Sequence, residues 1–223
     1  MAYKSADGAE SFFDAWLSAL RLRLQQPLPG LPAHARMAPE GRLNEKYHQA
    51  IRELKGQKSA VLVLLYPRKG QIFTVLIRRA AGIGPHSGQV GFPGGKAEPE
   101  DADAIATALR EANEELGLNT ALLQVLGTLT PVYIPVSRQT VFPVLAAAGA
   151  TPVLNPRPLE VQGVLRVNCS QLHDPKRHKK GTFLTAGGER IVAPYFLLNR
   201  NKVWGATALV LSELAELLRR PSS

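Results

Sequence analysis

The sequence predicts an α/β fold of the α+β kind, in which helices sandwich a mixed β-sheet and a helical extension precedes the domain. A dense apolar run at residues 59–66 is typical of a buried strand, and residues 71–78 have the pattern of its hairpin partner. Apolar residues recur at helical spacing over residues 102–116. The predicted strands and helices do not alternate regularly, which argues against a doubly wound parallel sheet.

The N-terminal part of the chain is predicted to be helical. Large apolar residues recur at spacings of one, three and four over residues 9–26, which predicts an amphipathic helix. The stretch from there to Arg42 is loop-like, and residues 44–54 predict a second, short helix. We expect residues 1–55 to form an extension that packs on a main domain of residues 56–220. A helix that binds a partner or forms a homodimer is the alternative.

The main domain begins with the hairpin, whose turn is predicted at Pro67–Gly70. A glycine-rich loop with a short strand near residues 88–92 leads to the helix, which Asp101 or Asp103 can cap and Gly117 can end. The apolar positions of this helix are expected to face the core, which leaves its glutamates facing elsewhere. The remaining predictions are strands at 122–128, 141–147 and 163–167, a helical turn at 167–172, a hairpin at 182–184 and 191–197, and a helix at 203–218.

Composition narrows the class of protein. The chain has 223 residues, 45% of them apolar, which favours a globular protein over a disordered one. It has no apolar run long enough to cross a bilayer and no signal-peptide pattern, so we expect a cytoplasmic protein without a membrane partner. The single cysteine, Cys169, is expected to be a small buried residue. The net charge of +9 suits a phosphate-rich substrate or a nucleic acid. Lys176–Lys180 is expected to be an exposed loop, with a phosphate-binding patch as the alternative.

Three carboxylates lie on one turn of the predicted helix. Glu111, Glu114 and Glu115 are spaced i, i+3 and i+4, so they share one face and repel one another. A divalent cation such as Mg²⁺ or Mn²⁺ would relieve that repulsion, and carboxylate oxygens are its preferred ligands. The alternative is a solvated helix face, but such faces usually carry a compensating cation at i+4, and none follows these glutamates.

These residues resemble a known family motif. Gly95 and the run Arg110–Leu118, which reads Arg-Glu-Ala-Asn-Glu-Glu-Leu-Gly-Leu, are similar to the Nudix box. The loop between the two parts is one residue longer than the general pattern. The first glutamate of that pattern therefore falls on Asp101 when counted from Gly95 and on Ala102 when counted from Arg110, and Asp101 and Asp103 are only weak substitutes for it. The resemblance implies a Nudix-type α/β/α sandwich and a hydrolase that cleaves the pyrophosphate of a nucleoside diphosphate derivative.

A second resemblance indicates a branch of the family. Arg79, His86, Gln89 and Phe92–Gly95 are similar to the signature that precedes the box in Nudix coenzyme A pyrophosphatases. The pair that begins at Glu160 and the closing Trp-Gly element at residues 203–208 are similar too, whereas Gly84 replaces an arginine of that signature. This resemblance implies cleavage of coenzyme A or acyl-coenzyme A to (acyl-)4′-phosphopantetheine and adenosine 3′,5′-bisphosphate.

The resemblance also implies roles for individual residues. Glu111, Glu114, Glu115 and Gly95 would hold Mg²⁺ or Mn²⁺, Arg110 would orient a glutamate, and Glu114, Glu115 or Glu160 would be the general base. Arg79, His86 and Gln89 would bind substrate, and Trp204 is expected to pack rather than stack on adenine.

Two other interpretations remain. One keeps the chemistry and changes the substrate to ADP-ribose, a nucleoside triphosphate or an RNA 5′ end, although the pre-box signature favours coenzyme A. A regulatory domain that binds nucleotides without catalysis is disfavoured, because all three glutamates of the box are retained.

Overall fold

The computed structural model describes residues 7–80, 88–185 and 187–219. In order, the helices and strands are α1 (Asp7–Leu24), α2 (Gly30–Ala35), α3 (Glu45–Arg52), β1 (Gln57–Arg68), β2 (Gln71–Arg79), β3 (Val90–Gly91), β4 (Gly94–Lys96), α4 (Ala104–Leu116), β5 (Leu123–Thr128), β6 (Val132–Ile134), β7 (Gln139–Ala148), β8 (Val161–Asn168), β9 (His178–Leu184), β10 (Arg190–Leu198), β11 (Asn201–Trp204) and α5 (Gly205–Leu218). Short 3-10 helices cover Thr120–Leu122, Cys169–His173 and Pro175–Arg177. Within these ranges, no helix is both long enough and apolar enough to cross a membrane.

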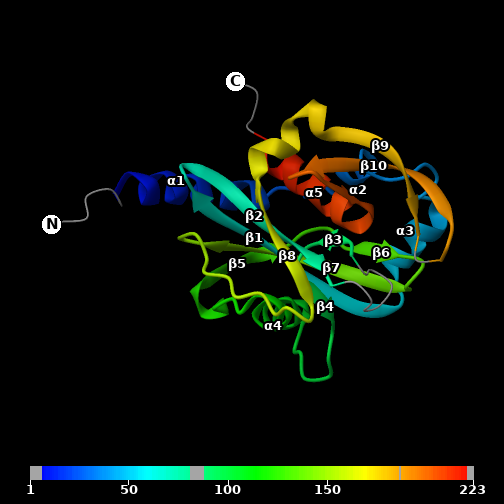
Figure 1. Cartoon of the computed structure of the whole chain (residues 1–223), viewed down its shortest axis with the longest axis horizontal. Helices are drawn as coiled ribbons and strands as arrows, with labels where there is room; N and C mark the ends of the chain where they lie inside the picture. Colours follow the sequence, from blue (N-terminus) through cyan, green and yellow to red (C-terminus); the bar gives the residue numbers. More distant parts are fainter. Residues whose placement is uncertain (1–6, 81–87, 186, 220–223) are drawn as a thin grey trace.

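A mixed β-sheet lies at the centre of the molecule (Figure 1). Strands β3, β2, β1, β7 and β5 follow one another across it, while β4 pairs with β1, β6 with β7, and β8 with β2. The β1–β7 pair is parallel and the other pairs are antiparallel. Strands β9, β10 and β11 form a separate antiparallel sheet. The predicted mixed sheet and both predicted hairpins are confirmed.

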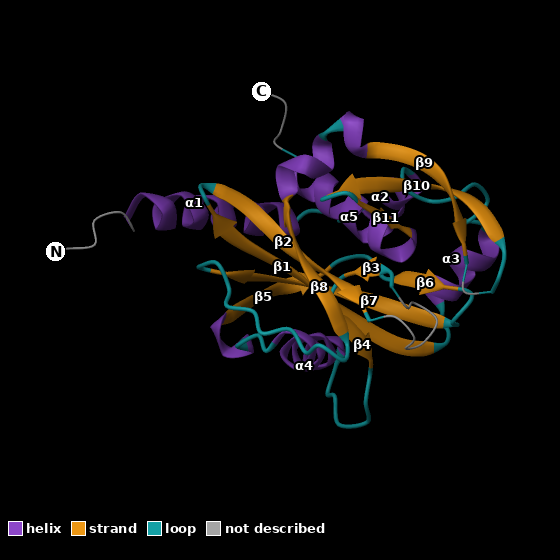
Figure 2. Ribbon diagram, viewed as in Figure 1, coloured by secondary structure: helices purple, strands orange, loops and turns teal. Residues whose placement is uncertain are grey.

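Helices cover both faces of the large sheet (Figure 2). On one face, Ala108, Ala112 and Leu116 of α4 pack against alternate residues of β1, such as Leu62 and Leu64. On the other face, α5 and α1 pack over the intervening residues of the same strand, Val63 and Leu65 among them, because successive side chains of a strand point to opposite faces. The predicted sandwich of helices around the sheet is confirmed.

The N-terminal helices share the core of the sheet. Phe13, Leu17 and Leu20 of α1 are buried in the same apolar cluster as α5. Asn44 caps α3, because its side chain accepts a hydrogen bond from the backbone N–H of Tyr47. The loop expected between the two predicted helices contains α2, which that prediction missed. The division of the chain at residues 55 and 56 stays a prediction.

A buried carboxyl group connects this N-terminal part to α5. Glu213 is fully buried, and its Oε2 lies 3.0 Å from Nε2 of His34, which is also fully buried. Its Oε1 accepts hydrogen bonds from the Thr130 hydroxyl at 2.7 Å and from the Gly30 N–H at 3.1 Å. One side chain therefore joins α5, α2 and the segment between β5 and β6.

The structure also corrects several predicted boundaries. Pro67 belongs to β1, and the turn of the hairpin is formed by Lys69 and Gly70, both in the left-handed region with φ of 51° and 68°. Strands β4, β6 and β11 were not predicted, and α5 begins at Gly205 because β11 precedes it. The basic run expected as a loop forms a 3-10 helix and the start of β9. Cys169 is buried, as expected.

Candidate active site beside helix α4

The last turn of α4 carries a glutamate that is buried rather than turned to solvent. Only 1% of Glu115 is exposed, so the prediction that the glutamates face away from the core is wrong for this residue. Its Oε2 accepts a hydrogen bond from the Gly94 N–H at 2.8 Å, and its Oε1 accepts one from Nη1 of Arg79 at 3.0 Å. Arg79 also donates to the Gly94 carbonyl. Glu115 thus fixes β4 and the end of β2 against α4.

Arg110 gathers the other carboxylates of the site. Its guanidinium lies 3.0 Å from Asp101, 3.2 Å from Glu111 and 3.4 Å from Glu114. It also donates to the Lys96 carbonyl at 2.9 Å. The expected pairing of Arg110 with a glutamate is therefore present. No cation follows the glutamates along the helix, and Arg110 and Arg79, which compensate their charge, both precede them in the sequence.

The environment shifts the ionisation of these groups in opposite directions. Burial raises the pKa of Glu115 to about 7, although Arg79 and the Gly94 N–H favour its charged form. Burial also raises the pKa of Glu111. Hydrogen bonds from Arg110 hold the pKa of Asp101 well below its usual range. Asp101 therefore keeps its charge and positions Arg110, whereas Glu111 and Glu115 are carboxylates that lack the stabilisation of water.

The backbone of β4 passes very close to Glu111. A Cβ atom at Gly95 would lie 2.2 Å from Oε1 of Glu111, which no side chain could tolerate without displacing that carboxylate. At Gly94, φ is 146° and a Cβ would lie 2.2 Å from the Ala60 carbonyl oxygen. The glycine pair is thus required for β4 to lie between β1 and the carboxylates of α4.

The carboxylate oxygens of this site are the donor type that a hard divalent cation prefers. Glu111 and Glu115 are one helical turn apart. Burial raises the pKa of both carboxyl groups, and a bound cation would stabilise their charged forms. In the described part of the chain, no three His, Cys, Asp or Glu side chains are grouped to hold an ion as they stand. Arg110 and Arg79 contact these carboxylates instead, so a cation would have to compete with both arginines.

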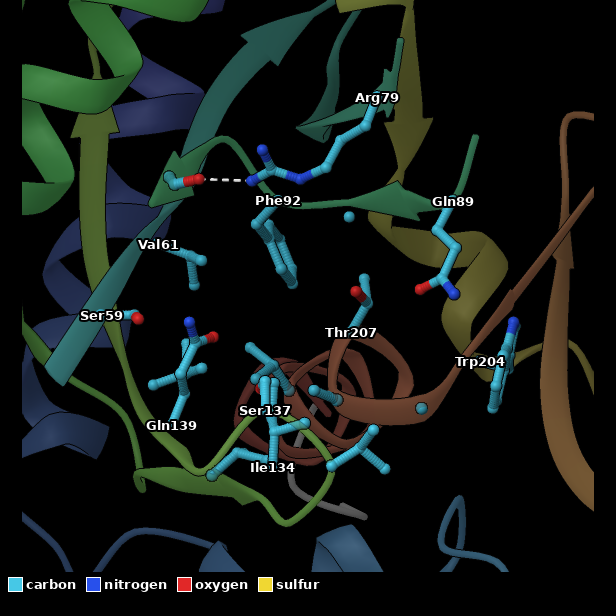
Figure 3. A pocket seen from close by; sticks show the side chains of 18 of the residues that line it. Ser59, Val61, Arg79, Gln89, Phe92, Ile134, Ser137, Gln139, Trp204 and Thr207 are labelled. Atoms are coloured by element: carbon cyan, nitrogen blue, oxygen red, sulfur yellow. Dashed lines mark hydrogen bonds between the residues drawn. The ribbon is translucent and has the colours of Figure 1, made fainter. Parts of the chain in front are cut away.

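A cavity of about 600 Å³ adjoins the site across β4 (Figure 3). Phe92, Val61 and Ile134 contribute to its apolar walls, and Trp204 lies at one side near Gln89. Its lining is completed by Arg42, Gln57, Ser59, Arg79, Val90, Gly91, Gly94, Gly95, Lys96, Val132, Val136, Ser137, Gln139, Val141, Thr185, Ile191, Gly205, Ala206, Thr207 and Val210. Arg79 therefore contacts Glu115 and lines the cavity as well.

The predicted substrate-binding residues are only partly brought together. Arg79 and Gln89 both line the cavity, while His86 lies outside the described residues. Glu160 is paired with Arg157 at 3.1 Å, and its charge is one of those that raise the pKa of Glu115. Trp204 stacks on Phe183 at 4.5 Å between ring centroids, so it packs as expected. It also lines the cavity.

Sequence patterns gave no signal for several polar residues that line the cavity. Arg42, Gln57 and Gln139 come from the N-terminal segment, β1 and β7, and no short motif contains any two of them. Only the pairing of β1 with β7 brings Gln57 opposite Gln139.

Comparison with known proteins agrees with this geometry. The family model described as the NUDIX domain matches residues 56–186. The chain belongs to the Nudix family. Members of this family are hydrolases that act on nucleoside diphosphate derivatives and generally use divalent metal ions. The chain is therefore a Nudix pyrophosphatase, as the motif at Arg110–Leu118 predicts.

Two relatives of this Nudix hydrolase are named as mitochondrial coenzyme A diphosphatase NUDT8. The protein from Homo sapiens is 38% identical over 163 residues, which cover 72% of this chain and 69% of the relative. The protein from Mus musculus is 34% identical over 195 residues, or 82% of this chain and 92% of the relative. A solved structure, the Nudix hydrolase RenU from M. smegmatis, superimposes with a TM-score of 0.51 at 21% identity and covers 72% of this chain and 84% of RenU. That likeness confirms the Nudix fold.

The raised pKa of Glu115 predicts how the stability of the metal-free protein depends on pH. The folded state retains the Glu115 proton up to about pH 7, whereas an ordinary glutamate loses it near 4.5. Between these values the folded state binds more protons than the unfolded state, so stability falls as pH rises. We expect wild type to lose about 3 kcal/mol relative to Glu115→Gln from pH 4.5 to 7.5. Urea unfolding of both proteins in chelator measures this difference, and a difference that does not change with pH would refute the assignment.

Proposed function

We propose that this Nudix hydrolase cleaves the diphosphate of coenzyme A or acyl-coenzyme A. The products would be 4′-phosphopantetheine, or its acyl form, and adenosine 3′,5′-bisphosphate. The observation that carries the proposal is the similarity to two coenzyme A diphosphatases over most of the chain. It is supported by Arg79, Gln89, Phe92, Gly94 and Gly95, which resemble the coenzyme A signature and all line the cavity.

In this proposal the acidic residues of α4 hold the cofactor. Glu111 and Glu115, assisted by Glu114 and the backbone at Gly95, would bind Mg²⁺ or Mn²⁺. The bound ion would offset the charge of the diphosphate and acidify a water molecule. Arg110 keeps Glu111 and Glu114 oriented, and Asp101 keeps Arg110 in place. We place the general base among Glu114, Glu115 and Glu160, since Glu160 is close enough to influence the ionisation of Glu115.

The overall reaction is a hydrolysis. The water oxygen forms a bond to one phosphorus, the bridging P–O bond breaks, and the base accepts the water proton. Because the diphosphate is anionic, most of the rate gain must come from neutralising and positioning it. We propose a cytoplasmic location, and because both relatives are named as mitochondrial, cell fractionation of the tagged protein distinguishes the two compartments.

A substrate panel tests the proposal. Purified protein with Mg²⁺ or Mn²⁺ is incubated separately with coenzyme A, acetyl- and octanoyl-coenzyme A, ADP-ribose, a nucleoside triphosphate and triphosphorylated RNA, and products are identified by mass. We expect coenzyme A or an acyl-coenzyme A to give the highest kcat/KM and to be cut at the diphosphate. Coenzyme A left intact while another substrate is consumed would overturn the assignment.

An RNA substrate is the second candidate, favoured by the net charge of +9. Binding of RNA through many phosphates weakens steeply as salt concentration rises, whereas binding of a small anion weakens less. The salt dependence of KM for RNA and for coenzyme A therefore discriminates between the two.

A further inference from the structure

One end of the cavity carries an arginine from the N-terminal segment. Arg42 lies between α2 and α3 and reaches the cavity wall. Its Nη2 donates to the Tyr133 carbonyl at 2.9 Å, and its guanidinium lies 5.8 Å from the centre of the Tyr47 ring. These two contacts fix the side chain at the end of the cavity where β6 meets β7.

The charge of Arg42 is not balanced by an acid. Among the residues that the structure describes, no carboxylate lies within ion-pair distance of it. Arg79, the other arginine of the cavity, is already paired with Glu115. Burial lowers the pKa of Arg42, which is the effect of removing water from a cation without supplying an anion. A partly buried, uncompensated cation on a cavity wall favours an anionic ligand.

Two hydroxyl groups of the cavity lining also lack partners among the described residues. Ser59 Oγ and Ser137 Oγ are buried and, within the described part of the molecule, have no hydrogen-bond partner, and the same holds for Nε of Arg42. Both serines line the cavity (Figure 3). Buried polar atoms in native proteins are rarely left unpaired. A ligand with several acceptor oxygens would pair these three groups once their side chains turned toward the cavity.

The position of this polar end relative to the diphosphate site limits the ligand further. Ser59 pairs with Lys96 in the β1–β4 register, and Gly95 is the next residue along β4. The anion at Ser59 and Arg42 would therefore lie close to a diphosphate held at Gly95. In coenzyme A, the only anionic group besides the diphosphate is the 3′-phosphate, which a single ribose ring separates from it. The pantetheine arm is neutral.

Building on the proposed function, we infer that Arg42, Ser59 and Ser137 form the binding site for the 3′-phosphate of the coenzyme A adenosine. The adenosine half of the substrate then occupies the cavity, where Phe92 and Trp204 offer aromatic surface. The pantetheine arm extends out of it. The N-terminal segment is thereby part of the substrate site, and Arg42 is a specificity-determining residue rather than a catalytic one.

Coenzyme A and dephospho-coenzyme A, which lacks only the 3′-phosphate, test this inference. We expect wild type to prefer coenzyme A by about tenfold or more in kcat/KM, and Arg42→Gln to abolish the preference by lowering kcat/KM for coenzyme A alone. Ser137→Ala should reduce the preference by a smaller factor. Arg52→Gln is the matched control, because Arg52 is an exposed arginine of the same segment whose partner is Glu45. It should leave the preference intact.

A second measurement does not depend on turnover. Affinities for adenosine 3′,5′-bisphosphate and AMP, compared by calorimetry, should differ about tenfold or more in wild type and little in Arg42→Gln. Equal losses for both ligands in the variant, with a lowered melting temperature, would show a structural role and overturn the inference. If coenzyme A is hydrolysed without any preference for the 3′-phosphate, the inference fails while the proposed function stands. If coenzyme A is not hydrolysed but the affinity difference depends on Arg42, the proposed function fails while the phosphate site stands.

Discussion

Replacing Glu111 and Glu115 together by glutamine is expected to lower kcat for diphosphate hydrolysis by about 10³-fold or more. Glutamine keeps the size of each side chain but removes the negative oxygens that a divalent ion requires. We expect little loss of folding stability, because the raised pKa values show that burial already disfavours the charged forms. Turnover with saturating Mn²⁺ measures kcat, and urea unfolding measures folding stability. Calorimetry measures the affinity for Mn²⁺, which we expect to fall.

The matched control for this double variant is Glu45→Gln. Glu45 is an exposed glutamate on α3, distant in the sequence from the motif and paired only with Arg52 among its described contacts. It should retain wild-type turnover and Mn²⁺ affinity. If the double variant hydrolyses its substrate at the wild-type rate, the metal site is not formed by these two glutamates.

The largest loss of stability is expected from Glu213→Ala. This variant removes the group that His34, Thr130 and the Gly30 N–H contact, and it leaves their polar atoms buried without a partner. Removing one partner from such a buried cluster typically costs about 3–5 kcal/mol. Urea unfolding monitored by circular dichroism measures the free energy of unfolding of the variant and of wild type.

Glu216 provides the comparison on the same helix. It pairs with Arg36 at 2.5 Å, but 52% and 29% of the arginine and glutamate side chains are exposed, so Glu216→Gln should cost less than about 1 kcal/mol. His34→Ala combined with Glu213→Ala should cost less than the sum of the single changes, because the two side chains are in contact. Additive losses would show that His34 and Glu213 contribute to stability independently.

Local sequence patterns predicted the longer strands and helices of the domain. The β1–β2 hairpin, α4 with its cap at Asp103 and its left-handed end at Gly117, and the β9–β10 hairpin all follow from alternation, helical periodicity and turn residues. Strands β4, β6 and β11 were missed because each is only three or four residues long and forms by pairing with a distant or longer strand. Periodicity needs a longer stretch than these provide.

In the candidate site, too, residues that are close in sequence were predicted and residues that only the fold brings together were missed. The three glutamates and Arg110 were found because they lie within two turns of one helix. The burial of Glu115 was not foreseen, since it depends on β4 and on Arg79 from another strand. The polar end of the cavity was missed for a related reason: Arg42, Ser59 and Ser137 are distant in sequence, and only the fold brings them to the lining of one cavity.

The position of Arg79 connects metal binding at the carboxylates of α4 with ligand binding in the cavity. Its guanidinium pairs with Glu115 on one side of β4 and lines the cavity on the other. A metal ion that took Glu115 as a ligand would release Arg79 from that carboxylate and leave its charge free for an anion. Cation loading and nucleotide affinity would then be thermodynamically linked, and each would strengthen the other by the same factor.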